Sequence, residues 1–199
     1  MIQALCVFCG SKTGILSVHE EAARELGREL AKHEIRLVYG GGNIGLMGVI
    51  ADEVLAHSGK VTGVIPEALT NRELAHTGVD DMRIVDSMHT RKATMAQLAD
   101  AFVALPGGIG TFEELFEILT WKQLGIHHKP VALLNVSGYY DPLLSLMDRA
   151  VAEGFLSSHN RELLWVETTV RSLMARLLAW KSPEQGAEDG DDEALEELT

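Results

Sequence analysis

The sequence has little cysteine, no long apolar run and no excess of basic residues, and each of these absences excludes a class of protein. Two cysteines in 199 residues are too few for a disulfide-stabilised scaffold or a four-cysteine zinc site. No apolar run approaches the roughly 18 residues that a membrane-spanning helix needs, and the first residues lack the pattern of a signal peptide. A net charge of −12 argues against a general nucleic-acid binder. We therefore expect a soluble, cytoplasmic protein with neither a membrane nor a nucleic-acid partner.

The acidic residues are concentrated at the C-terminal end of the chain. Residues 182–199 contain eight acids and no base, with little to bury, which is typical of a disordered solvating segment. The preceding part is nearly neutral, and the chain as a whole is 46% hydrophobic, which suffices for a core. We predict one domain over residues 1–181 and a disordered acidic tail over residues 182–199.

Short apolar runs alternate with longer amphipathic stretches along this domain. Nearly continuous apolar runs are typical of strands that are buried on both faces of a parallel sheet. They predict strands at 5–8, 37–39, 61–65, 82–85, 101–105, 131–134 and 163–166, and helices at 18–33, 46–56, 88–98, 111–124, 140–153 and 170–180. Such alternation implies right-handed crossovers. The predicted fold is a single doubly wound, Rossmann-like α/β domain, whose ligands bind beyond the carboxyl ends of the strands.

A first glycine turn follows the second predicted strand. Gly40-x-Gly42-x-x-Gly45 matches the dinucleotide-binding fingerprint letter by letter, between a strand and a helix. The fingerprint normally follows the first strand, however, so the match is weak. A tight turn that needs glycine for packing explains the pattern equally well, and the phosphate-binding and packing interpretations both stay open.

A second glycine turn, Gly107-Gly108-Ile109-Gly110-Thr111, follows the strand at 101–105. A turn of this kind at the start of a helix directs backbone N–H groups and the positive end of the helix dipole at an anion. Thr111 and Glu114 also have the spacing of a capping box, in which Glu114 would reach back to the first N–H groups of the helix. Spacing alone favours the cap, although a carboxylate at 114 would also point into the crevice, where a sugar hydroxyl could be held.

Two adjacent cations, Arg91 and Lys92, lie early in the helix predicted at 88–98. Cations in this position oppose the helix dipole, and an anionic ligand would offset that cost. A guanidinium suits bidentate binding of phosphate or carboxylate. A solvated basic turn on the surface is the alternative.

Together these segments resemble the Lonely Guy family, the cytokinin-activating phosphoribohydrolases often mislabelled lysine decarboxylases. The resemblance rests on motifs at the right separation and runs from about Leu5 to Trp180. The matching segments are Tyr39-Gly40-Gly41-Gly42-x-x-Gly45-Leu46-Met47-Gly48, Ser87-Met88-His89-x-Arg91-Lys92, Pro106-Gly107-Gly108-x-Gly110-Thr111-x-x-Glu114 and Leu134-Asn135-Val136-x-Gly138-Tyr139-Tyr140.

The resemblance implies hydrolysis of the N-glycosidic bond of a purine nucleoside 5′-monophosphate, such as AMP or an N6-substituted AMP, to the free base and ribose 5-phosphate. It places the catalytic roles on Arg91 and Glu114. Cleavage builds positive charge on the sugar, which a nearby carboxylate stabilises. With the strand ends and glycine turns, the candidate substrate-contacting residues are Gly10, Ser11, Gly41, Gly42, Glu73, Met88, Lys92, Gly107, Gly108, Ile109, Gly110, Thr111, Phe112, Glu113 and Thr120.

The resemblance also implies a homodimer, and the reaction needs neither a metal nor an organic cofactor. A lysine decarboxylase would need a pyridoxal-phosphate lysine and its supporting site, for which the sequence offers no candidate. The competing hypothesis is a non-catalytic nucleotide-binding or nucleotide-sensing Rossmann module that uses the same crevice.

Overall fold

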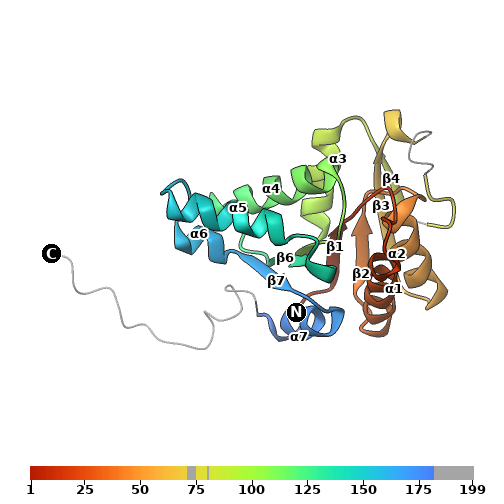
Figure 1. Cartoon of the computed structure of the whole chain (residues 1–199). Helices are drawn as coiled ribbons and strands as arrows, with labels where there is room; N and C mark the ends of the chain where they lie inside the picture. The colour runs from red at the N-terminus through yellow and green to blue at the C-terminus, as the bar shows by residue number, and fades with distance from the viewer. Residues whose placement is uncertain (71–74, 80, 182–199) are drawn as a thin grey trace, which may run out of the picture.

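The structure, a computed structural model, describes residues 1–70, 75–79 and 81–181 (Figure 1). The strands in this part are β1 (Ala4–Phe8), β2 (Arg36–Tyr39), β3 (Val61–Pro66), β4 (Asp81–Val85), β5 (Ala101–Ala104), β6 (Val131–Leu134) and β7 (Leu164–Glu167). The α-helices are α1 (Ser17–Lys32), α2 (Gly45–Ala56), α3 (Met88–Leu98), α4 (Ile109–Gln123), α5 (Asp141–Ala152), α6 (Ser158–Glu162) and α7 (Val170–Ala179). Two short 3-10 turns are η1 (Glu67–Leu69) and η2 (Val136–Gly138).

The strands form one parallel sheet in the order β4-β3-β2-β1-β5-β6-β7. The chain builds outward from β1 to β4 and then returns to the other side of β1, where β5 begins the second half. In the register, Leu5 of β1 is paired with Leu37 of β2 on one side and with Ala101 of β5 on the other. The order of the strands therefore reverses between β1 and β5, which is where ligands bind in sheets of this type.

Helices cover both faces of the sheet (Figure 1). One apolar cluster joins one face of the strands to α1, α2 and α7, and the other joins the opposite face to α3, α4 and α5. Successive strand residues point to opposite faces, so Leu5 and Val7 of β1 belong to the first cluster and Cys6 and Phe8 to the second. Burying one such large apolar side chain contributes about 1.5–3 kcal/mol, and these two clusters hold the strand ends in place.

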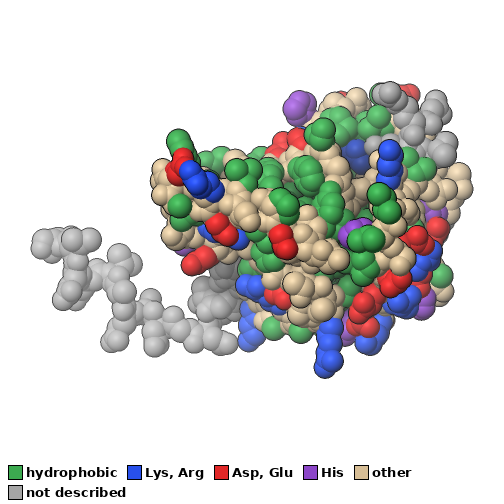
Figure 2. All heavy atoms as spheres, in the orientation of Figure 1, with side chains coloured by type: hydrophobic (Ala, Val, Ile, Leu, Met, Phe, Trp, Pro, Cys, Tyr) green, Lys and Arg blue, Asp and Glu red, His purple; other side chains and the backbone are tan. Residues whose placement is uncertain are grey.

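The surface over α1 and α2 carries interspersed charges of both signs (Figure 2). Arg24 and Arg28 of α1 both bind Glu53 of α2, at 3.2 and 3.0 Å. Exposed pairs of this kind contribute at most about 1 kcal/mol each, so the apolar cluster below them is what joins the two helices. Among the described residues, no helix is long and apolar enough to cross a membrane.

The predicted strands and fold class are confirmed, with two differences among the helices. The short α6 was not predicted, because Ser158–Glu162 carries no apolar periodicity. The fourth helix begins at Ile109 instead of Thr111. The boundary proposed at residue 181 stays a prediction, because residues 182–199 lie outside the described residues.

Candidate functional site

The glycine turn after β5 places backbone donors without an intrahelical partner at the start of α4. Gly108 is the residue before the helix, and the first intrahelical hydrogen bond runs from the Phe112 N–H to the Gly108 carbonyl, at 3.1 Å. The N–H groups of Ile109, Gly110 and Thr111 come before that bond and have no partner within α4. They lie at the positive end of the helix dipole. This helix start has the chemistry of an anion-binding site.

The capping-box interpretation of Thr111 and Glu114 is wrong. The helix already begins two residues before Thr111, and its cap residue is Gly108, which has no side chain to form a cap. Thr111 is a buried third residue of α4, and its side chain fills the space that a Cβ on Gly107 would need. The glycine at 107 allows this close packing and moves the helix start upstream. Glu114 is therefore not needed to begin the helix.

Gly108 and Gly110 differ from Gly107 in what surrounds them. A Cβ built on either residue would meet no atom within 4 Å. Their lack of a side chain is not required by protein packing, and it leaves the backbone of the turn accessible from the cleft. Glycine at such positions permits the close approach of a ligand to the main chain.

The turn after β2 is filled by the protein itself. The Arg91 guanidinium donates from Nη2 to the Gly40 carbonyl at 3.0 Å, and a Cβ on Gly40 would overlap that guanidinium. Gly41 has a φ of 78° and packs against Ile65 and Met82. Gly45 has a φ of 60° and lies against the backbone that follows β1. These contacts support the packing interpretation of this turn.

Arg91 is held in the wall of the cleft by α3. The helix begins at a formed cap, in which the Ser87 hydroxyl accepts a hydrogen bond from the Thr90 N–H at 3.1 Å. Arg91 is only 5% exposed, so the alternative of a solvated basic turn is wrong for this residue. Burial of a cation is costly unless polar groups hold it, and the Gly40 carbonyl is one such group.

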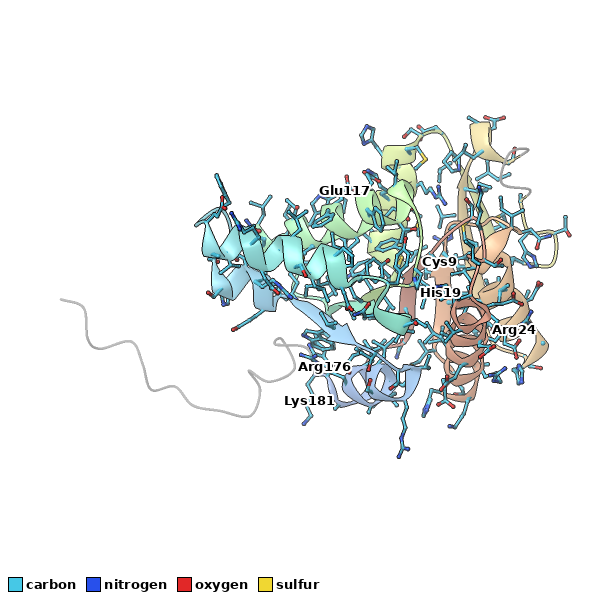
Figure 3. All side chains as sticks on the ribbon, in the orientation of Figure 1. Cys9, His19, Arg24, Glu117, Arg176 and Lys181 are labelled. Atoms are coloured by element: carbon cyan, nitrogen blue, oxygen red, sulfur yellow. The ribbon has the colours of Figure 1, made fainter. Side chains whose placement is uncertain are left out.

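Glu114 lies on the same cleft as Arg91, close to the end of β1. Burial raises the pKa of the Cys9 thiol, the negative charge of Glu114 raises it further, and the positive charge of Arg91 lowers it. Both charges therefore act on the sulfur that follows β1. Figure 3 shows Cys9 at this end of the strand, near His19 of α1.

Lys92 is not among the residues that line the cleft of Arg91, although its partner Glu113 is. Its ammonium binds the carboxylates of Glu113 and, at 3.0 Å, Glu117 of α4. Burial lowers the pKa of Lys92, but these two carboxylates raise it by more. Adjacent helical residues point about 100° apart, so one cation of the pair faces the cleft while the other joins α3 to α4.

The cleft has a volume of about 260 Å³ and opens at the reversal point of the sheet. The predicted site residues that line it are Gly10, Ser11, Met88, Arg91, Gly108, Ile109, Gly110, Thr111, Glu113 and Glu114. A second cleft of about 590 Å³ adjoins it, and the two share Gly10, Ser11 and Gly108. Gly107 lines only this second cleft.

Other predicted residues are not brought to the first cleft. Gly41 and Gly42 belong to the packed turn after β2, and Phe112 packs into the apolar cluster under α4. Thr120 is exposed, and its hydroxyl donates to the Phe116 carbonyl at 2.6 Å. Glu73 lies outside the described residues.

Three residues of the cleft were missed by sequence reasoning. Cys9, Met47 and Leu69 line it, from the ends of β1 and β3 and from the first turn of α2. Each lies directly after a strand or in the helix that follows one, and this position could have indicated that it lines the ligand cleft. Of the three, Met47 stands in a segment that resembles the family, but none of them was among the predicted site residues.

These features define the class of protein. It is a Rossmann-like α/β protein in which the start of a helix, a buried arginine and a carboxylate line one cleft at the reversal point of the sheet. Comparison with known proteins then identifies the family. A sequence profile described as "Possible lysine decarboxylase" matches residues 47–177.

Curated relatives match most of the chain. A probable cytokinin riboside 5′-monophosphate phosphoribohydrolase of Oryza sativa subsp. japonica is 53% identical over 87% of this chain and 78% of its own length. A second rice protein with the same name, without "probable", is 52% identical over 87% of this chain and 72% of its own. One from Arabidopsis thaliana is 53% identical over 87% of this chain and 80% of its own. The chain belongs to this family of phosphoribohydrolases.

Solved structures confirm the fold at lower identity. The molybdenum cofactor binding protein of Rippkaea orientalis has a TM-score of 0.68 and 20% identity, covering 90% of this chain and 97% of that one. A molybdenum cofactor carrier protein of Chlamydomonas reinhardtii has a TM-score of 0.66 and 22% identity, covering 90% of this chain and 99% of its own. At such identities the likeness concerns the fold alone.

Proposed function

We propose that the protein hydrolyses the N-glycosidic bond of purine nucleoside 5′-monophosphates, with AMP or an N6-substituted AMP as substrate. One observation carries the proposal: a buried arginine, a carboxylate and three N–H groups unpaired within α4 line one cleft of about 260 Å³. This is the set of groups that binding a phosphorylated sugar and stabilising positive charge on it requires. It also agrees with the names of the relatives.

The reaction assigns a role to each group. The N–H groups of Ile109, Gly110 and Thr111 bind phosphate oxygens, and Arg91 holds the ribosyl phosphate by its guanidinium. As the bond from C1′ to the purine nitrogen breaks, its electron pair stays on the base and positive charge develops on the sugar. The Glu114 carboxylate stabilises that charge. A water oxygen bonds to C1′ and loses a proton, and the base leaves with a proton on its nitrogen.

The profile's description names a different reaction, and the cleft does not suit it. A pyridoxal-phosphate decarboxylase needs a lysine whose amine reaches the cofactor. In the described part of the chain, no lysine lines the cleft that holds Arg91 and Glu114. Lys92, the nearest in sequence, is bound to two carboxylates of α4.

The test compares AMP with adenosine, following free adenine by chromatography. Phosphate binding at a distance from C1′ lowers the barrier there, so we expect AMP to be cleaved far faster than adenosine. Comparable kcat/KM values for the two would refute the role of the α4 turn. Tight AMP binding without adenine release would instead favour a nucleotide sensor. The same assay with N6-substituted nucleotides would establish the preferred base.

A homodimer formed along α4 is part of this proposal. Ile109, Phe116 and Leu124 are 85%, 38% and 67% exposed, and their spacing puts them on one face of the helix with Thr120. Thr120 lies about 15 Å along the helix from Gly110, away from the cleft of its own chain. A second copy packed on this face would bury the apolar side chains and bring its Thr120 toward the first chain's site.

Two measurements test the dimer. Phe116→Asp should give monomers by light scattering, whereas Leu178→Asp, at a 46% exposed position on α7, should not. Mixing subunits of Glu114→Gln with subunits of Thr120→Ala should restore activity, because one of the two shared sites then has both native side chains. If the mixture stays inactive while both variants dimerise, each site belongs to one chain.

A further inference from the structure

Three successive carbonyl groups on the rear of the glycine turn are held by hydrogen bonds. The Tyr140 hydroxyl donates to the Leu105 carbonyl at 2.6 Å, and the Gly10 N–H donates to the Pro106 carbonyl at 3.1 Å. The Tyr139 hydroxyl donates to the Gly107 carbonyl at 2.5 Å. Two of the three donors are adjacent tyrosines from a segment that the reaction scheme does not use.

The loop after β6 is built to present these two tyrosines. The Asn135 side chain accepts the Tyr140 N–H through Oδ1 and donates to Asp141 through Nδ2, both at 2.7 Å. Ser137 and Gly138 take left-handed conformations, with φ of 54° and 71°. A non-glycine residue in that region is strained, so the surrounding contacts impose this turn. It directs Tyr139 and Tyr140 at the strand end next to β6.

Aromatic contacts fix the two rings. Tyr139 and Tyr140 are edge-to-face with their centroids 5.0 Å apart, and His19 of α1 lies edge-on to Tyr139 at 5.9 Å. Burial raises the pKa of the Tyr140 hydroxyl, which keeps it protonated and able to donate. The ring contacts hold both hydroxyls at the carbonyls to which they donate.

The bond from Tyr139 is not needed to satisfy a buried carbonyl. Gly107 is half-buried and Tyr139 is 39% exposed, so the bond lies at a partly open edge of the turn. What the bond does fix is the orientation of the peptide between Gly107 and Gly108. Glycines on both sides make that peptide free to rotate. Rotation would turn a carbonyl oxygen toward the cleft, where it would repel a phosphate.

We propose that Tyr139 and Tyr140 are positioning residues of the phosphate-binding turn. By holding the carbonyls at its rear, they fix the backbone that leads into α4 and keep the oxygen of the Gly107–Gly108 peptide turned away from the 5′-phosphate. This inference rests on the proposed function, because it concerns the phosphate of that substrate. It assigns a role to the Asn135–Asp141 segment, which the reaction scheme does not use and of which Tyr139 lines the second cleft.

The test uses Tyr139→Phe and Tyr140→Phe, which remove one hydroxyl each. Loss of one such hydrogen bond corresponds to about a threefold to tenfold change. We expect kcat/KM for AMP to fall by that factor, the affinity for ribose 5-phosphate measured by calorimetry to fall similarly, and kcat/KM for adenosine to stay unchanged. If the tyrosines had a merely structural role, kcat/KM would fall for AMP and for adenosine together, and the melting temperature would fall as well.

Tyr39→Phe is the matched control. The Tyr39 side chain is fully buried, and its hydroxyl has no hydrogen-bond partner among the described residues, so removing it should leave both the AMP kinetics and the ribose 5-phosphate affinity unchanged. Equal losses for AMP and adenosine in Tyr139→Phe, or no loss in either, would overturn the proposal. If the native protein releases no adenine from AMP, the proposed function fails. The calorimetric comparison then still decides whether the tyrosines support phosphate binding.

Discussion

The two glycine turns of this protein look alike in the sequence and do opposite things in the structure. The turn after β2 is packed against its own chain, and a Cβ on Gly40 would collide with Arg91. The turn after β5 is open, and a Cβ on Gly108 or Gly110 would meet nothing within 4 Å. Glycine thus marks a close approach to the backbone. Whether the approaching group is protein or ligand is determined by the tertiary structure and not by the glycine pattern.

The two turns are nevertheless parts of one site. The turn after β2 positions the arginine that lines the cleft at the turn after β5. The Gly40 carbonyl accepts a hydrogen bond from the Arg91 guanidinium at 3.0 Å. Substitutions in the turn after β2, which positions Arg91, should therefore affect stability and activity together. Substitutions in the turn after β5, where we place the ligand, should affect mainly activity.

The largest effect is expected for the carboxylate beside the open turn. Glu114→Gln should lower kcat on AMP by roughly a hundredfold or more, because the neutral amide cannot stabilise positive charge on the sugar. Because α4 begins at Ile109 without a side-chain cap, its start should be unaffected. The comparison is Glu113→Gln, which removes the charge of a cleft residue that binds Lys92 and should retain most activity, because adjacent helical residues point about 100° apart. Native turnover in Glu114→Gln, measured by adenine release, would exclude a catalytic role for the carboxylate.

Gly40→Ala should come next and should damage both stability and activity. The added methyl group occupies the space of the Arg91 guanidinium, and overpacking of this kind costs about 1–3 kcal/mol. The displaced arginine no longer lines the cleft, so adenine release should fall as well. Thermal unfolding and the AMP assay measure the two losses. Unchanged values in both would show that the turn after β2 is as open as the turn after β5.

Gly108→Ala should separate binding from stability. Gly108 has extended dihedrals, φ −100° and ψ −156°, which alanine adopts freely, and the position precedes a helix, where the change costs no more than about 1 kcal/mol. The methyl group points into the space where we place the phosphate. KM for AMP should therefore rise while the melting temperature stays within a few degrees. A fall in stability as large as that of Gly40→Ala would erase the distinction between the two turns.

Removing residues 182–199 should have the smallest effect. Within the described part of the chain, the buried residues of the two apolar clusters lie between Ile2 and Leu177, and a solvated acidic segment is expected to add no core. We expect the truncated protein to keep its melting temperature and its AMP kinetics. A loss of several degrees, or of the dimer, would show that the acidic residues do more than solvate the chain.

The sequence predicted the sheet more reliably than the site. Strands such as Val131–Leu134 are continuous apolar runs buried on both faces, and only a parallel sheet between helices accommodates them. Arg91 and Lys92 were predicted to act together, yet one lines the cleft and the other binds Glu113 and Glu117. Adjacent positions on a helix point in different directions, and only the packing of α3 against α4 determines which one faces the cleft.

By itself, the sequence determined the order of strands and helices, the class of fold and the segments at the strand ends, because periodicity and glycine are local properties of the chain. Only the tertiary structure decided what each segment contacts. It filled the turn at Gly40 with an arginine 51 residues away, left the turn at Gly108 open, and brought Tyr139 to the Gly107 carbonyl across 32 residues. The reason is physical: these contacts depend on which strands become neighbours, and pairing between distant segments leaves no local signature in the sequence.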